Sequence, residues 1–286
     1  MKPRRIPLLL ALAAALVPAA EPAAEDPFGP VFERLYNWDF PASLRRIDHY
    51  VSSAPEDPLG HSVRAAVLLF QEMGRLEILQ GEFFADNRRI TEKKKLKTDA
   101  ELRRRLYDAV ARARQLAEAR LARDPGDRNA LFALCMATGV ATDYASFIEK
   151  KLWGALNTAR ESHAYALRLL HLDPGFYDAY LTTGLTEYLL GSVPFFVRWF
   201  VRFDEAKGDK NRAVTNLELV ARKGRYYGPF AKVLLSVIHL REKRFPDSER
   251  LLVELSRDYP ENPLIRTELA KLSARNRKAA AEAQGQ

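Results

Sequence analysis

The chain has 286 residues, 29% of them charged and 47% hydrophobic, and its formal net charge is +8. This balance excludes an intrinsically disordered chain and a chain embedded throughout in a membrane. Glycine is sparse, at 14 residues, and the abundance of Ala, Leu, Arg and Glu favours an all-α fold over a sheet-rich one.

Residues 1–20 have the layout of a secretory signal peptide. Lys2, Arg4 and Arg5 precede an uncharged apolar stretch, and small residues up to Ala20 offer a cleavage site. The apolar stretch is shorter than the ~20 residues that span a bilayer. We therefore predict export to the periplasm or cell envelope, with secretion possible and an uncleaved membrane anchor as the alternative. Cleavage would lower the net charge to +5, which is no nucleic-acid signature.

The mature chain divides by composition into three parts. Residues 21–30 are rich in Pro, Ala, Glu and Asp and predict a flexible leader. Residues 31–273 contain amphipathic helical segments and predict one helical-repeat domain. Residues 274–286 are Ala-rich, end in Gln-Gly-Gln, and predict a disordered tail.

Four helical segments end in the same way. Each begins with a small residue twelve positions before a proline, and an apolar or small residue follows four positions later. The small residue lets two helices approach closely, and the proline ends the helix. The segments run over 43–55, 113–125, 162–174 and 248–260.

This pattern resembles the second helix of a tetratricopeptide repeat (TPR). Tyr180 and Gly184 match the aromatic and glycine positions of a first helix, and Ile265, Leu269 and Leu272 form the apolar stripe of a closing helix. The prolines are 70, 49 and 86 residues apart, so the repeats are irregular. The resemblance implies an all-α, TPR-like, right-handed solenoid of about five irregular helix pairs and a capping helix.

Residues 180–263 also resemble a particular TPR family, which includes the yeast mitochondrial outer-membrane and inclusion-body-clearance protein and its bacterial relatives. The matching motifs are Gly184 with Tyr188–Pro194, Gly208-Asp-Lys-Asn-Arg212, Tyr226-Tyr227 and Asp258–Pro263. The resemblance implies helical repeats and protein interaction, with no catalytic residues. The Gly-Asp-Lys-Asn-Arg turn departs from the Gly-Asp-Arg of that family.

No pattern in the sequence indicates catalysis, a cofactor or a metal. The five histidines form no chelating pair at helical spacing, and nucleophile-elbow, phosphate-loop and dinucleotide motifs are missing. The single cysteine, Cys135, lies in an apolar run and predicts a buried structural thiol. We therefore expect a protein that is not an enzyme.

First-helix residues at TPR groove positions are the candidate partner-binding set. They are mainly apolar, which favours a hydrophobic peptide or helix as the guest. The alternative is that insertions fill the groove and make these residues part of the core. The set is Asn129, Phe132, Met136, Asp178, Leu181, Leu185, Tyr188, Phe230, Val233 and Val237.

Residues 194–203 are the most unusual segment, since half of them are aromatic. Phe195, Phe196, Trp199 and Phe200 are candidate anchors for a membrane interface or a partner, and the alternative is a helix packed inside the solenoid. The basic stretch 88–105 favours an anionic membrane surface or a solvated loop. The leading hypothesis is an exported, non-catalytic TPR scaffold that binds a protein or peptide; peripheral membrane association through 194–203 is second.

Overall fold

The computed structural model describes residues 26–79, 96–192 and 205–284, and in these ranges the chain is all-α. Eleven α-helices and two short helical turns make up this part of the structure. The α-helices are α1 (Gly29–Tyr36), α2 (Phe40–Ser53), α3 (Pro58–Arg75), α6 (Ala100–Arg123), α7 (Arg128–Asp143), α8 (Leu152–Leu172), α9 (Tyr180–Ser192), α11 (Lys210–Lys223), α12 (Gly228–Arg241), α13 (Phe245–Asp258) and α14 (Pro263–Gln284). The turns are η1 (Tyr144–Ile148, π) and η2 (Tyr177–Ala179, 3₁₀).

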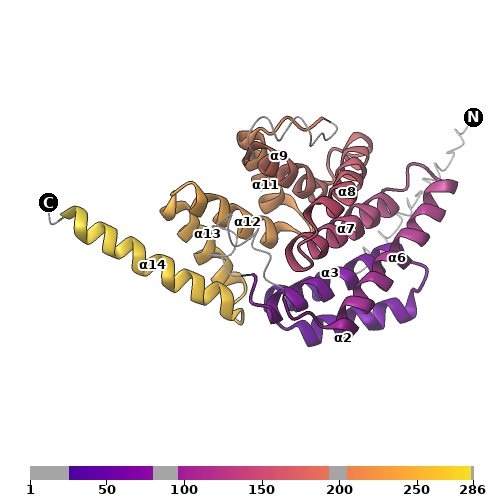
Figure 1. The fold of residues 1–286 in the computed structure, drawn as a ribbon, viewed down its shortest axis with the longest axis horizontal. Coiled ribbons are helices and arrows are strands. Elements are labelled where there is room, and N and C mark those ends of the chain that lie inside the picture. Colours follow the sequence, from indigo (N-terminus) through magenta and orange to yellow (C-terminus); the bar gives the residue numbers. More distant parts are fainter. Residues whose placement is uncertain (1–25, 80–95, 193–204, 285–286) are drawn as a thin grey trace, which may run out of the picture.

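Consecutive helices pack in five pairs, followed by α14 (Figure 1). The pairs are α1 with α2, α3 with α6, α7 with α8, α9 with α11, and α12 with α13. We call the members of each pair its first and second helix. The prediction of an all-α repeat fold with about five helix pairs is confirmed.

The prolines mark the ends of second helices, as predicted. The residue before each of the four prolines has left the helical region, with φ between −129° and −145°, because a proline disfavours helical backbone in the residue before it. These residues are Ala54, Asp124, Asp173 and Tyr259.

The small residues lie where two helices of a pair meet. All four are fully or almost fully buried: Ser43, Ala113, Ser162 and Ser248. Ser43 donates a 2.8 Å hydrogen bond to the carbonyl of Val31 in α1, and Ser162 donates one of 2.9 Å to that of Cys135 in α7. Close helix packing keeps water away from these carbonyls, and the serine hydroxyls supply the hydrogen bonds instead.

The turns that leave the first helices share a left-handed residue. Trp38, Glu77, Lys150 and Lys243 have φ between 56° and 69°. In three of these turns a backbone N–H beyond the helix donates to the carbonyl five residues earlier, as from Ile78 to Met73. This is the Schellman type of helix end, which satisfies terminal carbonyls before the chain reverses.

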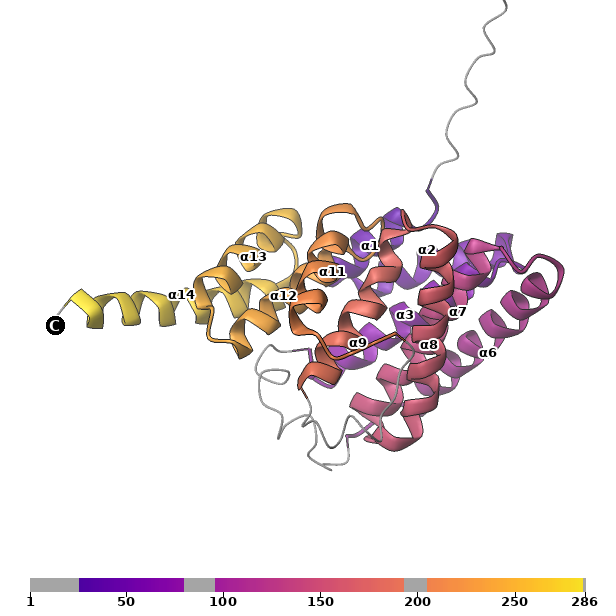
Figure 2. The same cartoon turned by 90° about the horizontal axis from the view of Figure 1, so that it is seen from above.

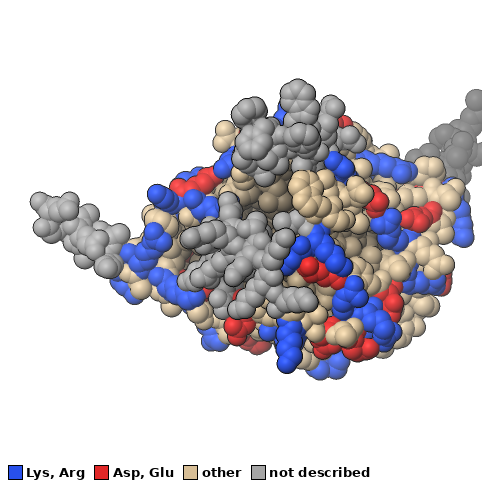
Figure 3. Space-filling model, in the orientation of Figure 1, with Lys and Arg blue, Asp and Glu red and all other residues tan. Residues whose placement is uncertain are grey.

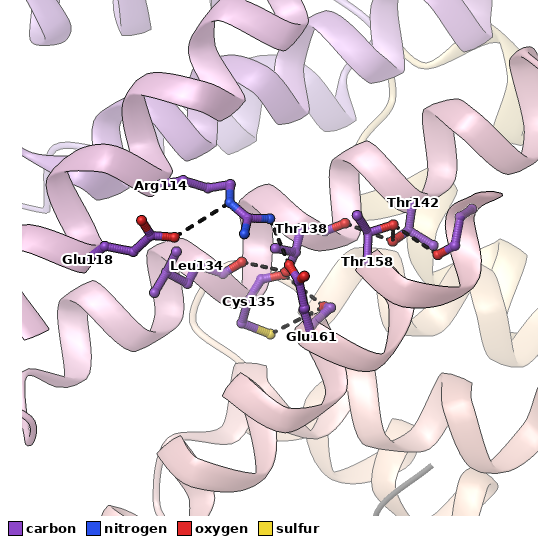
Figure 4. Close-up of polar contacts among 10 residues, drawn as sticks. Arg114, Glu118, Leu134, Cys135, Thr138, Thr142, Thr158 and Glu161 are labelled. Carbon is purple, nitrogen blue, oxygen red and sulfur yellow. Dashed lines mark hydrogen bonds and ion pairs between the residues drawn. The ribbon is translucent and has the colours of Figure 1, made fainter. Parts of the chain in front are cut away.

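Helix α7 is the centre of the core. Residues 130–137 are all buried, which confirms the predicted buried face. In the described part of the chain, only the stretch Arg128–Ile148 is long and apolar enough to cross a membrane, and 61% of it is buried inside the protein. Polar side chains tie α7 and its neighbours together, with Thr142 donating to Thr158 at 3.0 Å and Arg114 of α6 pairing with Glu161 of α8 at 2.7 Å (Figure 4).

Two predicted boundaries are wrong. The predicted leader 21–30 includes Phe28, which is buried against Tyr50 and Tyr226, and α1 already begins at Gly29. The predicted tail 274–286 is helical as far as Gln284, because its alanines favour the helix that α14 has already started. Figure 1 shows the far end of α14 projecting from the body.

Candidate functional site

The first helices α3, α7, α9 and α12 line one side of the solenoid, which we call the concave face. Phe70 of α3 and Phe230 of α12 meet across this face edge to face, with ring centroids 5.3 Å apart. Since α7 and α9 lie between these two helices in chain order, the face must be strongly curved. A strongly curved face leaves little room for a guest.

Helix α1 covers one end of the concave face. Phe28, Phe32 and Tyr36, spaced four apart, present one side of the helix to Tyr226 at the start of α12. The Phe32 and Tyr226 rings stack with centroids 5.2 Å apart, and the Tyr36 hydroxyl donates a 2.8 Å hydrogen bond to the Tyr226 carbonyl. Asp26 adds an ion pair with Arg225 at 3.0 Å.

The start of α14 joins the same contact. Asn262 donates a 2.7 Å hydrogen bond from its side chain to the carbonyl of Tyr36, and the Glu261 N–H donates to the Asn37 side chain at 3.3 Å. The first helix of the chain is thus held by residues of the last two repeats. Figure 2 shows α1 behind α11.

Half of the predicted partner-binding set belongs to the core. These five residues are at most 7% exposed: Phe132, Met136, Asp178, Leu181 and Tyr188. Phe132 packs against Phe176 and against Tyr226 and Tyr227 next to α1. Tyr226 and Tyr227, just before α12, thus cover Phe132, and Phe32 of α1 stacks in turn on Tyr226.

Asp178 holds the start of α12 in place. Its carboxylate accepts backbone hydrogen bonds from Arg225, Tyr226 and Tyr227 at 2.8–3.1 Å. Burial raises the pKa of Asp178, although these donors and the nearby Arg225 oppose the shift. The geometry gives this residue a structural role within the chain.

The other half of the set is partly exposed: Asn129, Leu185, Phe230, Val233 and Val237. The Asn129 amide donates to Asp57 at 3.1 Å, and Val233 packs towards α13 and α14. Leu185 and Val237 belong to none of the three buried clusters. Both are partly exposed, so within the described part of the chain they are the apolar members of the set that are not packed into a buried cluster.

Asp143 is a further concave-face residue, which sequence reasoning missed. It follows Phe132 and Met136 at spacings of eleven and seven, so it lies on the same side of α7. Its carboxylate has neither a hydrogen bond nor an ion pair to a described residue, and burial alone raises its pKa to about 7. A lone acid at the end of an otherwise apolar stripe was the signal in the sequence.

Two other buried carboxylates are fully used inside the fold. Glu187 of α9 accepts from the backbone N–H groups of Gly208 at 2.7 Å and Asp209 at 2.9 Å. Glu72 of α3 accepts from the Asp99 N–H at 2.9 Å and pairs with Arg75. Each holds the start of the second helix in its own pair, at α11 and α6.

The described residues offer no reactive or metal-binding arrangement. No group of three or more His, Cys, Asp or Glu residues within 26–79, 96–192 and 205–284 could hold a metal ion. Cys135 is buried beside Thr182, and burial raises the pKa of its thiol, which disfavours the reactive thiolate. The predicted structural thiol is confirmed.

The predicted membrane or partner anchors, Phe195, Phe196, Trp199 and Phe200, lie outside the described residues. Of the basic stretch 88–105, the described part mixes both signs, since Arg103 pairs with Glu149 and Arg104 with Glu101 and Asp108. Figure 3 likewise shows acidic side chains interspersed with basic ones over the described part of the visible face. Such mixing weakens attraction to a polyanion.

Comparison with known proteins adds one distant structural likeness. No protein-family model matches the chain, and no curated protein matches it. Among solved structures, the chain is similar to a thermophilic TPR protein of Thermus thermophilus, with a TM-score of 0.47 and 14% identity over 88% of this chain and 100% of that one. The all-α repeat fold follows from the helix packing itself, and the resemblance of residues 180–263 to a particular TPR family stays a prediction.

Proposed function

We propose that this protein is an exported, non-catalytic helical scaffold that binds another protein through the part of its concave face that α1 leaves open. The observation that carries the proposal is the pair Leu185 and Val237, which lie on neighbouring first helices and outside every buried cluster. Apolar side chains on a concave helical face suit a hydrophobic peptide or helix.

The fold supports a scaffold more than an enzyme. The carboxylates Glu72, Asp178 and Glu187 are engaged in holding backbone turns, and the Cys135 thiol is buried. These four side chains, which could in principle react, therefore serve the structure. The part of the concave face that α1 leaves open carries apolar groups. Binding surfaces of this kind act through shape and apolar contact.

Export rests on the layout of residues 1–20, which lie outside the described part of the chain. The mass of the protein recovered from the native cell envelope tests it. A mature chain that lacks about the first 20 residues supports export, as a cleaved signal peptide requires. Full-length protein in the cytoplasm contradicts export without affecting the binding proposal.

Site-specific photo-crosslinking in native cells tests the binding surface. A photoreactive residue at position 189, whose leucine is 54% exposed beside Leu185, should yield one dominant protein adduct. Leu185→Glu with Val237→Glu should remove that adduct, because charged side chains cannot enter an apolar contact without loss of hydration. Circular dichroism checks that the variant stays helical.

Val253→Glu is the matched control. Val253 is a 50% exposed apolar residue on α13, a second helix, so it lies away from the concave face. The control should retain the adduct. An adduct that survives the concave-face variant, or that disappears equally in the control, contradicts the proposed surface.

A further inference from the structure

We infer that Asp143 is a recognition carboxylate for a lysine or arginine side chain of the protein partner, seated beside Leu185 and Leu189 on the concave face. The inference rests on the proposed function, because it states the chemistry of the guest at that same surface. It commits to a guest segment in which a basic residue stands next to apolar ones.

The position of Asp143 follows from the contact between α7 and α9. Cys135 of α7 and Thr182 of α9 touch, with Sγ and Oγ1 3.3 Å apart. Two turns further along each of these first helices lie Asp143 and Leu189, which therefore sit at the same level. Leu185 precedes Leu189 by one turn, so the carboxylate borders the open apolar strip.

No described residue compensates the charge of Asp143. The other buried or half-buried carboxylates of the first helices have donors: three backbone N–H groups for Asp178, three with Arg212 for Glu187, and Arg75 with a backbone N–H for Glu72. Asp143 has none among the described residues.

The environment of Asp143 favours an incoming cation. Burial is the cause of its raised pKa, and no basic group of the described residues opposes the shift. Tyr227, just before α12, is within electrostatic reach of Asp143, and its pKa is raised well above the usual value, so its hydroxyl stays neutral and cannot compensate the carboxylate charge. A residue that is only partly buried also leaves room for a ligand atom. A partner ammonium or guanidinium would supply the missing charge-assisted hydrogen bond.

The surface is narrow enough to select for this pairing. Phe70 and Phe230 meet across the concave face at 5.3 Å, and α1 covers the end near Tyr226. A guest is thereby confined to the strip at the end of α7 and α9, where Asp143 is the carboxylate without a donor. Charge complementarity then distinguishes guests that are equally apolar.

Selection from a phage-displayed library of random dodecapeptides tests the inference on the folded mature chain. Peptides selected by the natural sequence should be enriched in apolar residues adjacent to Lys or Arg. Asp143→Asn, which keeps the size of the side chain, should retain the apolar enrichment and lose the basic one. A peptide selected on the natural sequence should bind Asp143→Asn about tenfold more weakly or worse, the loss expected for a hydrogen bond to a charged group.

The outcomes separate the inference from the proposed function. The inference is overturned, but the binding surface is supported, by one outcome. In it, the selected peptides lack a basic preference, bind Asp143→Asn as well as the natural sequence, and no longer bind the Leu185→Glu with Val237→Glu variant. Both the inference and the proposed function are overturned if the selection shows no enrichment. They are also overturned if the natural protein, the Leu185→Glu with Val237→Glu variant and Asp143→Asn all bind the selected peptides equally. Asp108→Asn, on an exposed face of α6, serves as the control and should change neither preference.

Discussion

Asp143 is costly to the folded protein because it is partly buried and no described residue neutralises its charge. Its pKa rises to about 7 in the folded state, whereas the usual value is 3.8. The folded state therefore holds a proton that the unfolded chain releases between these two values. Stability must fall as pH rises through this window, and the full cost is present above the folded pKa.

The variant Asp143→Asn should remove this pH dependence. At about pH 8 it should be more stable than the natural sequence by on the order of 2 kcal/mol, since one pKa unit corresponds to about 1.4 kcal/mol and partial exposure lessens the cost. Near pH 3 the difference should largely vanish, because Asp143 is then mostly protonated in both the folded and the unfolded state. Urea unfolding at the two pH values measures it.

The exposed Asp108, whose side chain is 66% accessible, provides the comparison. Asp108→Asn should show no gain that grows with pH. If Asp143→Asn gained no more at high pH than at low pH, the carboxylate would have to be stabilised by a group that the fold does not show.

Sequence reasoning at the residue scale located the concave stripe and then failed to say which of its members were free. Helical spacing placed Phe132, Leu185 and Val237 on one face of their helices. Whether another segment covers that face depends on distant parts of the chain, and Tyr226, just before α12, covers Phe132. Asp143 was missed because spacing does not show whether an acid has a partner.

At the scale of elements, α9 and α11 approach each other closely because α9 has glycine at the points of contact. A Cβ at Gly191, near the end of α9, would lie 2.6 Å from the carbonyl oxygen of Gly208 before α11. A Cβ at Gly184 would lie 3.2 Å from the Ala213 carbonyl oxygen and the Asn216 Cβ. The helices α9 and α11 are thus packed with backbone against backbone.

Gly191→Ala should destabilise the protein by roughly 1–3 kcal/mol, the usual cost of overpacking, because the clash is with backbone. Gly154→Ala on α8 is the matched control, since its Cβ would find only the Lys151 Cβ, at 3.8 Å. The control should be neutral or gain up to ~1 kcal/mol from the helix preference of alanine. Equal midpoints of urea unfolding for the two variants would contradict this account of the pair.

The elements that could be predicted are those whose ends carry local signals. Four second helices end at a proline and hold a small residue against their partner, and both features are visible in the sequence. Helix α11 has the small buried Ala213 and then Leu217, but Arg225 stands at the position, twelve residues after Ala213, where a proline would mark the end. The repeat was therefore harder to recognise there.

At the scale of the whole molecule, α1 closes the solenoid on itself. The hydrogen bond between Tyr36 and Tyr226 joins residues 190 positions apart, and the bond between Tyr226 and Asp26 joins residues 200 apart. Contacts at such separations leave no local pattern in a sequence. This explains why residues 26–30 were predicted as leader and why the filled groove was left open as an alternative.

Phe32→Ala should open this closure. Loss of a buried phenylalanine costs about 3–5 kcal/mol, and the loss should appear at both ends of the chain. Hydrogen exchange should accelerate in α1 and also around Tyr226 and Tyr227, which the ring contacts.

Phe40→Ala, which removes a buried ring that packs locally on Trp38 and Gly74, is the comparison. Its exchange should accelerate in the first two repeats and leave residues 225–232 protected. Unchanged protection of residues 225–232 in Phe32→Ala would show that α1 does not support the start of α12.

Closure by α1 also sets an order of events during biosynthesis. Most helix pairs of a solenoid can form as soon as their own residues leave the ribosome or an export channel, because their contacts are local. Helix α1 is made first, but Arg225, Tyr226 and Asn262 are made about 190 to 230 residues later. Its apolar side, with Phe28 and Phe32, stays without its final partners until the chain is nearly complete. Among the described helices, α1 is thus the first to be synthesised, yet it waits for partners that are made more than 220 residues later.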